Sequence, residues 1–352
     1  MSDSPTKPTA EPMAPIAPAE PDEPSPWDSA EDPSRLPFGK FGKLTPIVCG
    51  MVFGLLLRLA FSGAPSSRWS AMVGAFIWLV PLATGAITVY LAERQQRRSW
   101  SYYAWAPALA TALVVMGSLL ILIEGLICAV VIVPLFTFMG MAGGLCMGLV
   151  CRLTRWPRHA AYGFAVLPLA AALVLPQGAP DQMGQVERSL WINAPASVVW
   201  EGITNIRNIQ PHEVNTAWTY RIGVPPPVEA VTVQEGNQRV RKSRWAKGVH
   251  FDEVIQDWEP GRHLRWTYRF GPDSIPAGAL DDHVAIGGAY FDLNDTAYTL
   301  TPEAGGTRLH LRVSYRVSTD FNTYANWWAQ ALLDNFAQTV LQLYKTRLEG
   351  SA

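Results

Sequence analysis

Five apolar stretches between residues 44 and 176 constrain the fold of this chain more than any other feature. A helix that crosses about 30 Å of hydrocarbon needs about 20 mostly apolar residues. The stretches are 44–62, 71–91, 104–123, 126–150 and 160–176. The last of them is short and contains Pro168. We therefore expect an α-helical transmembrane bundle of about five spans in the first half of the chain.

The basic residues beside these stretches predict an orientation, because short cytoplasmic loops are enriched in Lys and Arg. They precede the first stretch and follow the second and fourth: Lys40, Lys43, Arg94, Arg97, Arg98, Arg152, Arg155 and Arg158. With five spans all of them face the cytoplasm of a bacterial-type inner membrane, together with the N-terminus. The C-terminal half is then periplasmic or otherwise extracytoplasmic. If 160–176 does not cross, that half is cytoplasmic instead.

Small residues recur at four-residue steps in the fourth stretch, at Gly140, Gly144 and Gly148. Such rows let helix backbones approach closely within a membrane. We expect them to pack against other helices of the same chain, with a homodimer interface as the alternative. Glu124 and Gly125 separate the third and fourth stretches and predict the tip of a helical hairpin. No chain of ionisable residues runs through the stretches, which argues against a pump or transporter.

The remaining composition excludes several classes of protein. Residues 1–40 are rich in proline and polar residues and predict a disordered tail rather than a signal peptide. All four cysteines, Cys49, Cys128, Cys146 and Cys151, lie in or beside the apolar stretches, so no disulfide framework is predicted. The net charge of −1 among 352 residues gives no reason to expect nucleic acid as a partner.

After Pro180 the chain has the composition of a soluble protein and alternates apolar with polar residues. Period-two alternation is typical of antiparallel strands with one buried face. We expect strands at 186–193, 217–222, 238–246, 249–258, 263–270, 289–300 and 308–317. A short helix should begin with Pro195 at its first position. A long helix is expected from about Asn322 to Glu349, with an apolar stripe at helical spacing.

These elements resemble a known superfamily over about residues 185–350. The resemblance rests on the run from Leu190 to Trp200, on Phe251 to Trp266 with its Trp258-Glu259-Pro260-Gly261 turn, and on the long terminal helix. This part of the chain is similar to the START-like (SRPBCC) superfamily of polyketide cyclase/dehydrase and lipid-transport domains. The resemblance implies an α+β helix-grip domain at 185–350, in which a curved antiparallel sheet of about seven strands encloses a hydrophobic cavity around the C-terminal helix.

A cavity of this kind is expected to be mostly apolar with a few orienting polar groups. Strand alternation and helical spacing place seven side chains on its wall: Trp266, Tyr268, Tyr298, Tyr315, Trp328, Leu332 and Phe336. Each of them either contacts a ligand or simply fills the core.

Several polar residues are weaker candidates for chemistry. His250 and Asp252 share one strand face, and Asp281, Asp282 and His283 predict a loop at the cavity mouth. Together they suggest an acid/base pair or a metal site, although neither has diagnostic spacing. The alternative is a solvated loop and an outward-facing strand pair. The basic residues of the strand 238–246, including Arg241, are expected on the solvated side of the sheet, where they face water or anionic headgroups.

The chain is therefore expected to be a membrane-anchored module that binds a lipid or other hydrophobic small molecule, without a metal or cofactor. One alternative is an enzyme of the cyclase, dehydratase or hydrolase kind that uses His250, Asp252 or His283. The other is a membrane scaffold whose soluble domain docks a protein. No phosphate-binding loop, nucleophile elbow or zinc-peptidase motif is present in the sequence.

Overall fold

The computed structural model describes residues 42, 44–154, 158–176, 178–281 and 283–350. The expected tail at 1–40, Arg155 and Asp282 lie outside them. The first half of the described chain is helical. Its helices are α1 (Thr45–Ala60), the π-helical turn η3 (Ala75–Leu79), α2 (Val80–Glu93), α3 (Trp100–Leu120), α4 (Leu126–Thr154) and α5 (Arg158–Val174).

Among the described residues, three helical segments are long and apolar enough to cross a membrane. They are Ala75–Glu93, which joins η3 to α2, then α3 and α4. Helices α1 and α5 have 16 and 17 residues and fall short of that length. The structure thus supports membrane association through three helices, and the five spans expected from the sequence are not shown. The hairpin tip expected at Glu124 and Gly125 lies between the end of α3 and the start of α4.

Glycines let α4 approach its neighbours closely. A Cβ atom on Gly140, Gly144 or Gly148 would collide with atoms of α3, among them the ring of Tyr103. A Cβ atom on Gly143 would lie 2.0 Å from the carbonyl oxygen of Leu82 in α2. The row of glycines is therefore used for packing within the chain.

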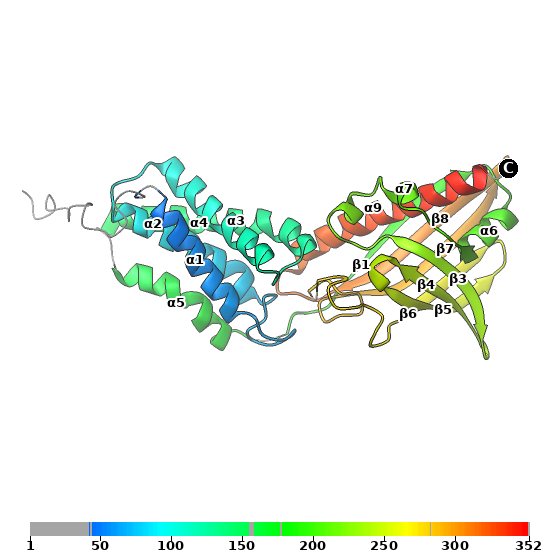
Figure 1. The fold of residues 1–352 in the computed structure, drawn as a ribbon, viewed down its shortest axis with the longest axis horizontal. Helices are drawn as coiled ribbons and strands as arrows, with labels where there is room; N and C mark the ends of the chain where they lie inside the picture. Colours follow the sequence, from blue (N-terminus) through cyan, green and yellow to red (C-terminus); the bar gives the residue numbers. More distant parts are fainter. Residues whose placement is uncertain (1–41, 43, 155–157, 177, 282, 351–352) are drawn as a thin grey trace, which may run out of the picture. The chain divides into compact units, whose positions relative to one another are not determined.

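The second half is a curled antiparallel sheet with a helix along one face (Figure 1). Its eight strands are ordered β1-β8-β7-β6-β5-β4-β3-β2. They are β1 (Gln182–Ile192), β2 (Asn205–Ile206), β3 (Pro227–Glu235), β4 (Gln238–Trp245), β5 (His250–Glu259), β6 (His263–Arg269), β7 (Phe291–Glu303) and β8 (Gly306–Val317). The C-terminal helix α9 (Asn322–Glu349) contributes Ala337, Val340 and Leu341 to one apolar core with the sheet. This arrangement is consistent with the expected helix-grip fold.

Three details of the expected elements were wrong. Residues 217–222 form the short helix α8 (Trp218–Arg221) instead of a strand, because the Thr219 amide donates to Oδ1 of Asn335 in α9. Strands β2 and β3 were not expected. Pro195 is the residue before helix α6 (Ala196–Thr204) and not its first residue.

An ion pair ties the end of α9 to the short helix α7 (Pro211–Val214). The Nε and Nη2 atoms of Arg347 donate to both carboxylate oxygens of Glu213, at 2.7 and 2.6 Å. Bidentate pairs of this kind are among the stronger hydrogen bonds in proteins. The Arg347 guanidinium lowers the pKa of the Glu213 carboxyl to about 2, against 4.5 in the unfolded chain.

This pair should make stability depend on pH. The folded chain binds fewer protons at Glu213 than the unfolded chain between these two pKa values, so unfolding becomes easier as pH falls. We expect Glu213→Gln to lower the free energy of unfolding by about 2 to 3 kcal/mol near neutral pH. The difference should shrink below about pH 4.5 and vanish near pH 2. Denaturant titrations at several pH values measure it, and a difference that does not change with pH would contradict the assignment.

Candidate functional site

A cavity with a volume of about 270 Å³ includes the space between the sheet and α9. Six of the seven side chains expected on its wall line it: Trp266, Tyr268, Tyr298, Trp328, Leu332 and Phe336. Tyr315 is the exception. It is fully buried, its ring packs against Gly184, and its hydroxyl donates to Oδ1 of Asn326 at 2.8 Å. Contact of the six residues with a ligand stays a prediction.

A buried ion pair lies on the same wall and was missed in the sequence. Arg241 of β4 and Glu253 of β5 are opposite each other in the sheet register, and Nη1 of Arg241 donates to the Glu253 carboxylate. Arg241 is only 5% exposed and Glu253 only 4%. Arg241 was expected on the solvated face, so that expectation was wrong. The available signal was the period of two, which places Arg241 on the same face as Ser243 and Trp245, away from Lys242.

The neighbours of the pair form a polar end to an otherwise apolar cavity. Nη2 of Arg241 lies 3.3 Å from the hydroxyl of Tyr344, and the guanidinium lies 5.2 Å from the ring centroid of Trp266. Burial raises the pKa of Tyr268, Tyr298 and Tyr344, so their hydroxyls stay protonated near neutral pH. Burial also raises the pKa of the Glu253 carboxyl, while Arg241 opposes that rise.

Two hydrogen-bond donors at this end lack a partner in the described structure. They are Nε of Arg241 and Nε1 of Trp266, and both residues are more than nine-tenths buried. A buried donor without an acceptor costs about 1 to 3 kcal/mol. An acceptor oxygen on a bound molecule would remove that cost.

The cavity is not confined to the C-terminal half. The described residues from 44 to 350 belong to one compact unit, and the same cavity is also lined by Met72, Phe76, Val115, Ile132 and Phe136 from the helical half. It therefore connects the space between sheet and α9 with the space between the apolar helices.

Polar residues surround the cavity where the two halves meet. Nε of Arg58 donates to Oε1 of Glu124 at 2.7 Å, and Nε2 of His283 lies 4.0 Å from Oε2 of Glu124. Arg58 also donates to the carbonyl oxygens of Phe61 and Ile123. We call Arg58, Glu124 and His283 the waist of the cavity, and all three line it.

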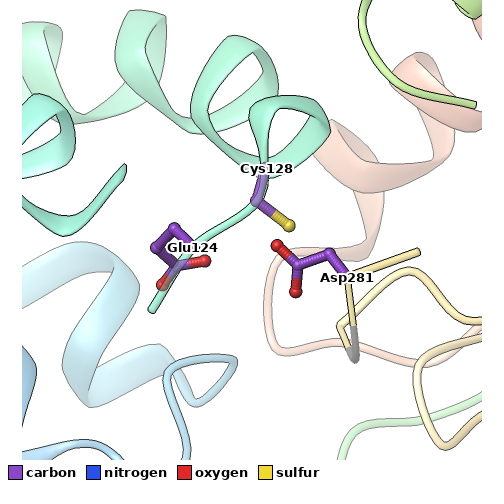
Figure 2. Close-up of side chains that lie close together, drawn as sticks. All are labelled: Glu124, Cys128 and Asp281. Atoms are coloured by element: carbon purple, nitrogen blue, oxygen red, sulfur yellow. The ribbon is translucent and has the colours of Figure 1, made fainter. Parts of the chain in front are cut away.

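Asp281 of the expected mouth loop lies beside Glu124 and Cys128 at the tip of the α3–α4 hairpin (Figure 2). Oδ2 of Asp281 accepts a hydrogen bond from the Gly125 amide at 2.6 Å. Ligand atoms of Glu124, Cys128 and Asp281 lie within 4.8 Å of one another, close enough in principle to share a cation. Both carboxylates, however, already accept hydrogen bonds from Arg58 and Gly125. The arrangement therefore fits a contact that holds Asp281 against the hairpin tip better than it fits a metal centre.

The other polar candidates lie apart from the cavity. His250 is exposed and faces Asp273 at 3.6 Å, while Asp252 pairs with Lys242 at 2.8 Å and with Arg269 at 2.7 Å. Neither residue lines the cavity. Among the described residues, no hydrogen bond or ion pair joins His250 or Asp252 to Asp281 or His283. The described residues of this group do not form one acid/base or metal site, and among them only His283 lines the cavity.

Comparison with known proteins identifies the C-terminal half. A family model described as "Polyketide cyclase / dehydrase and lipid transport" matches residues 183–349. These residues form a domain of that type. The matched range contains the sheet and α9, whereas the helical half lies outside it.

Solved structures similar to this domain have low sequence identity. A protein of Thermus thermophilus is 16% identical, with 48% of this chain and 99% of that chain covered and a TM-score of 0.30. A Mesorhizobium loti protein is 19% identical, with coverages of 49% and 98% and a TM-score of 0.28. The Zhui aromatase/cyclase of a Streptomyces species is 14% identical, with coverages of 48% and 94% and a TM-score of 0.29. No curated protein matches the chain.

Proposed function

We propose that this protein is a membrane-anchored module that binds a lipid or other hydrophobic small molecule in the cavity between sheet and α9. One observation carries the proposal: a single, mostly apolar cavity is lined both by the helix-grip domain and by apolar helices of membrane-spanning length. A ligand that dissolves poorly in water can pass along such a cavity from the bilayer without crossing the aqueous phase. The description of the matching family, which includes lipid transport, supports the same reading.

The chemistry of the wall supports a ligand that is largely apolar. Apart from the waist and the Arg241–Glu253 end, the lining consists chiefly of aliphatic and aromatic side chains. Pockets of this composition hold apolar molecules and orient them through a few polar contacts.

Cavity-filling substitution tests the proposal. Leu332 lines the cavity and is only partly buried, so Leu332→Trp should fill space rather than disrupt the core. We expect wild-type protein purified from its host membrane to carry an apolar molecule in stoichiometric amount, and Leu332→Trp to lose at least about 90% of it. The loss follows because one methylene-sized overlap already costs about 1 kcal/mol or more in a packed site.

Solvent extraction followed by mass spectrometry measures the bound molecule. Val233→Trp is the matched control, because Val233 is 39% exposed and does not line the cavity. Equal extractable ligand in wild type, Leu332→Trp and Val233→Trp would show that the molecule is only annular lipid and would contradict the proposal.

Contacts at the two ends of the helices support an orientation in the membrane. Nη2 of Arg152 donates to the carbonyl oxygen of Arg98 at 3.0 Å, so the basic ends of α2 and α4 meet. The Gly125–Asp281 contact joins the C-terminal domain to the opposite end of α4. Because basic ends favour the cytoplasm, we propose an extracytoplasmic C-terminal domain and a cytoplasmic N-terminus.

Reporter fusions test this orientation. Alkaline phosphatase attached after Ala352 should be active in a bacterial host, and green fluorescent protein at the same place should be dark. The reverse pair of results would place the domain in the cytoplasm and overturn the proposed orientation, while leaving ligand binding untouched.

Neither alternative function gains a specific observation. The enzyme alternative used His250, Asp252 or His283; the first two lie outside the cavity, and His283 lines it without a described contact to either of them. The docking alternative called for a filled core, whereas the domain contains a cavity.

A further inference from the structure

The lining of the cavity extends over a long path. In α9 it runs from Ala325 to Tyr344, a rise of about 28 Å at 1.5 Å per residue. In α4 it runs from Ile127 to Phe136, a rise of about 14 Å that partly overlaps the start of the α9 stretch, because the Tyr324 hydroxyl donates to the Val131 carbonyl oxygen. Because its volume of about 270 Å³ is spread over such a path, the cavity is narrow. It suits an extended chain better than a compact ring system.

The two regions of this path that contain charged side chains differ in how well their groups are satisfied; elsewhere on the lining, Oγ1 of Thr219 and Nε1 of Trp328 also lack a partner among the described residues. At the waist, all three nitrogen atoms of the Arg58 guanidinium donate to an acceptor. Among the three waist residues, the one buried polar side-chain atom without a described partner is Nδ1 of His283. At the far end, Nε of Arg241 and Nε1 of Trp266 are both free donors. The far end therefore offers the stronger site for a ligand oxygen.

The charge at the far end is already balanced. The Glu253 carboxylate neutralises the Arg241 guanidinium, and both are buried. An anionic ligand group would add a second negative charge to a region of low dielectric, which is unfavourable unless it is separately paired. An uncharged acceptor such as a hydroxyl or carbonyl oxygen meets the two free donors without that cost.

We propose that the ligand is a long single-chain molecule with an uncharged oxygen at one end. The oxygen lies beside Arg241 and Trp266. The chain runs along α9, passes the waist and ends between η3, α3 and α4. This inference rests on the proposed function and adds the class of ligand and its direction of binding.

Two photoreactive probes test the direction with the full chain in nanodiscs of phosphatidylethanolamine and phosphatidylglycerol. Both are hexadecan-1-ol; one carries a diazirine on the last carbon and the other on the carbon next to the hydroxyl-bearing carbon. The tip probe should label Met72 or Ile132, and the head probe should label residues near Arg241. Excess hexadecan-1-ol should remove at least about 80% of this labelling, since site occupancy is saturable. Labelling of the outward-facing Phe138 and Leu149, which are 59% and 47% exposed, should persist.

The possible outcomes separate the two proposals. Competable labelling by both probes that is confined to α9 and the sheet would overturn the extended binding mode while leaving ligand binding in place. Labelling with the two ends exchanged would overturn the direction. The absence of any competable labelling would overturn this inference and count against the proposed function as well.

Substitution at the bundle end adds a matched comparison. Ile132→Trp should remove the competable tip labelling and leave head labelling within about twofold of wild type, whereas Ile132→Ala should retain both. Ile132→Phe serves if the Trp variant is not recovered folded. Hexadecanoic acid should compete at least about tenfold less well than hexadecan-1-ol, because its carboxylate would face Glu253. Equal competition by the acid would overturn the uncharged end group.

Discussion

Arg241→Met is expected to lower the free energy of unfolding of the C-terminal domain by about 3 to 5 kcal/mol. Removing one partner of a buried ion pair leaves the other charge in a region of low dielectric without compensation. Glu253, which is 4% exposed in the wild-type structure, would lose the guanidinium that pairs with it. Denaturant titration of the full chain in detergent, followed by tryptophan fluorescence, measures the change.

The double variant Arg241→Met/Glu253→Leu is the control for this result. Replacing both members of a buried pair by apolar residues is often neutral or stabilising. We expect it to recover most of the stability lost in Arg241→Met but to bind the ligand more weakly, because Nε of Arg241, one of the two donors for its oxygen, is gone. A single variant within about 1 kcal/mol of wild type would show that Glu253 does not depend on Arg241, and would contradict the account of the polar end.

Gly143→Val is expected to destabilise the helical half by about 3 kcal/mol or more. Its Cβ atom would lie 2.0 Å from the backbone carbonyl oxygen of Leu82, which cannot move aside as a side chain can. Overpacking costs about 1 to 3 kcal/mol even where side chains can adjust. The fraction of protein recovered as a single species after heating in detergent measures the effect.

Gly163→Val is the matched control, since a Cβ atom on Gly163 in α5 meets no atom within 4 Å. It should leave thermal recovery close to that of wild type. Equal thermal recovery of the two variants would show that position 143 does not need glycine for α4 to approach α2. That result would contradict the described helix packing.

Local periodicity was sufficient to predict the long helix and most strands of the C-terminal domain. The long helix was predicted at Asn322–Glu349 and was found with the same bounds, because its apolar stripe repeats over many turns. Strands β1, β4, β5, β6, β7 and β8 were predicted within a few residues. The six-residue window 217–222 was too short for period two to be decisive, and a contact with Asn335 holds it as a helical turn.

The polar end of the cavity could not be predicted in the same way. Arg241 and Glu253 become partners only through the register of β4 with β5, which depends on pairing between strands rather than on either strand alone. An arginine in a basic run is also usually solvated. The continuity of the cavity into the helices depends on how the α3–α4 hairpin meets the mouth loop, and no pattern within either half contains that information.

Native mass spectrometry of the full chain, released from nanodiscs made directly from its host membrane, tests the central claim most directly. We expect one apolar molecule per chain that survives removal of annular lipid and that is absent from Leu332→Trp. A folded wild-type chain that carries no such molecule would contradict the claim that this cavity is a ligand-binding site.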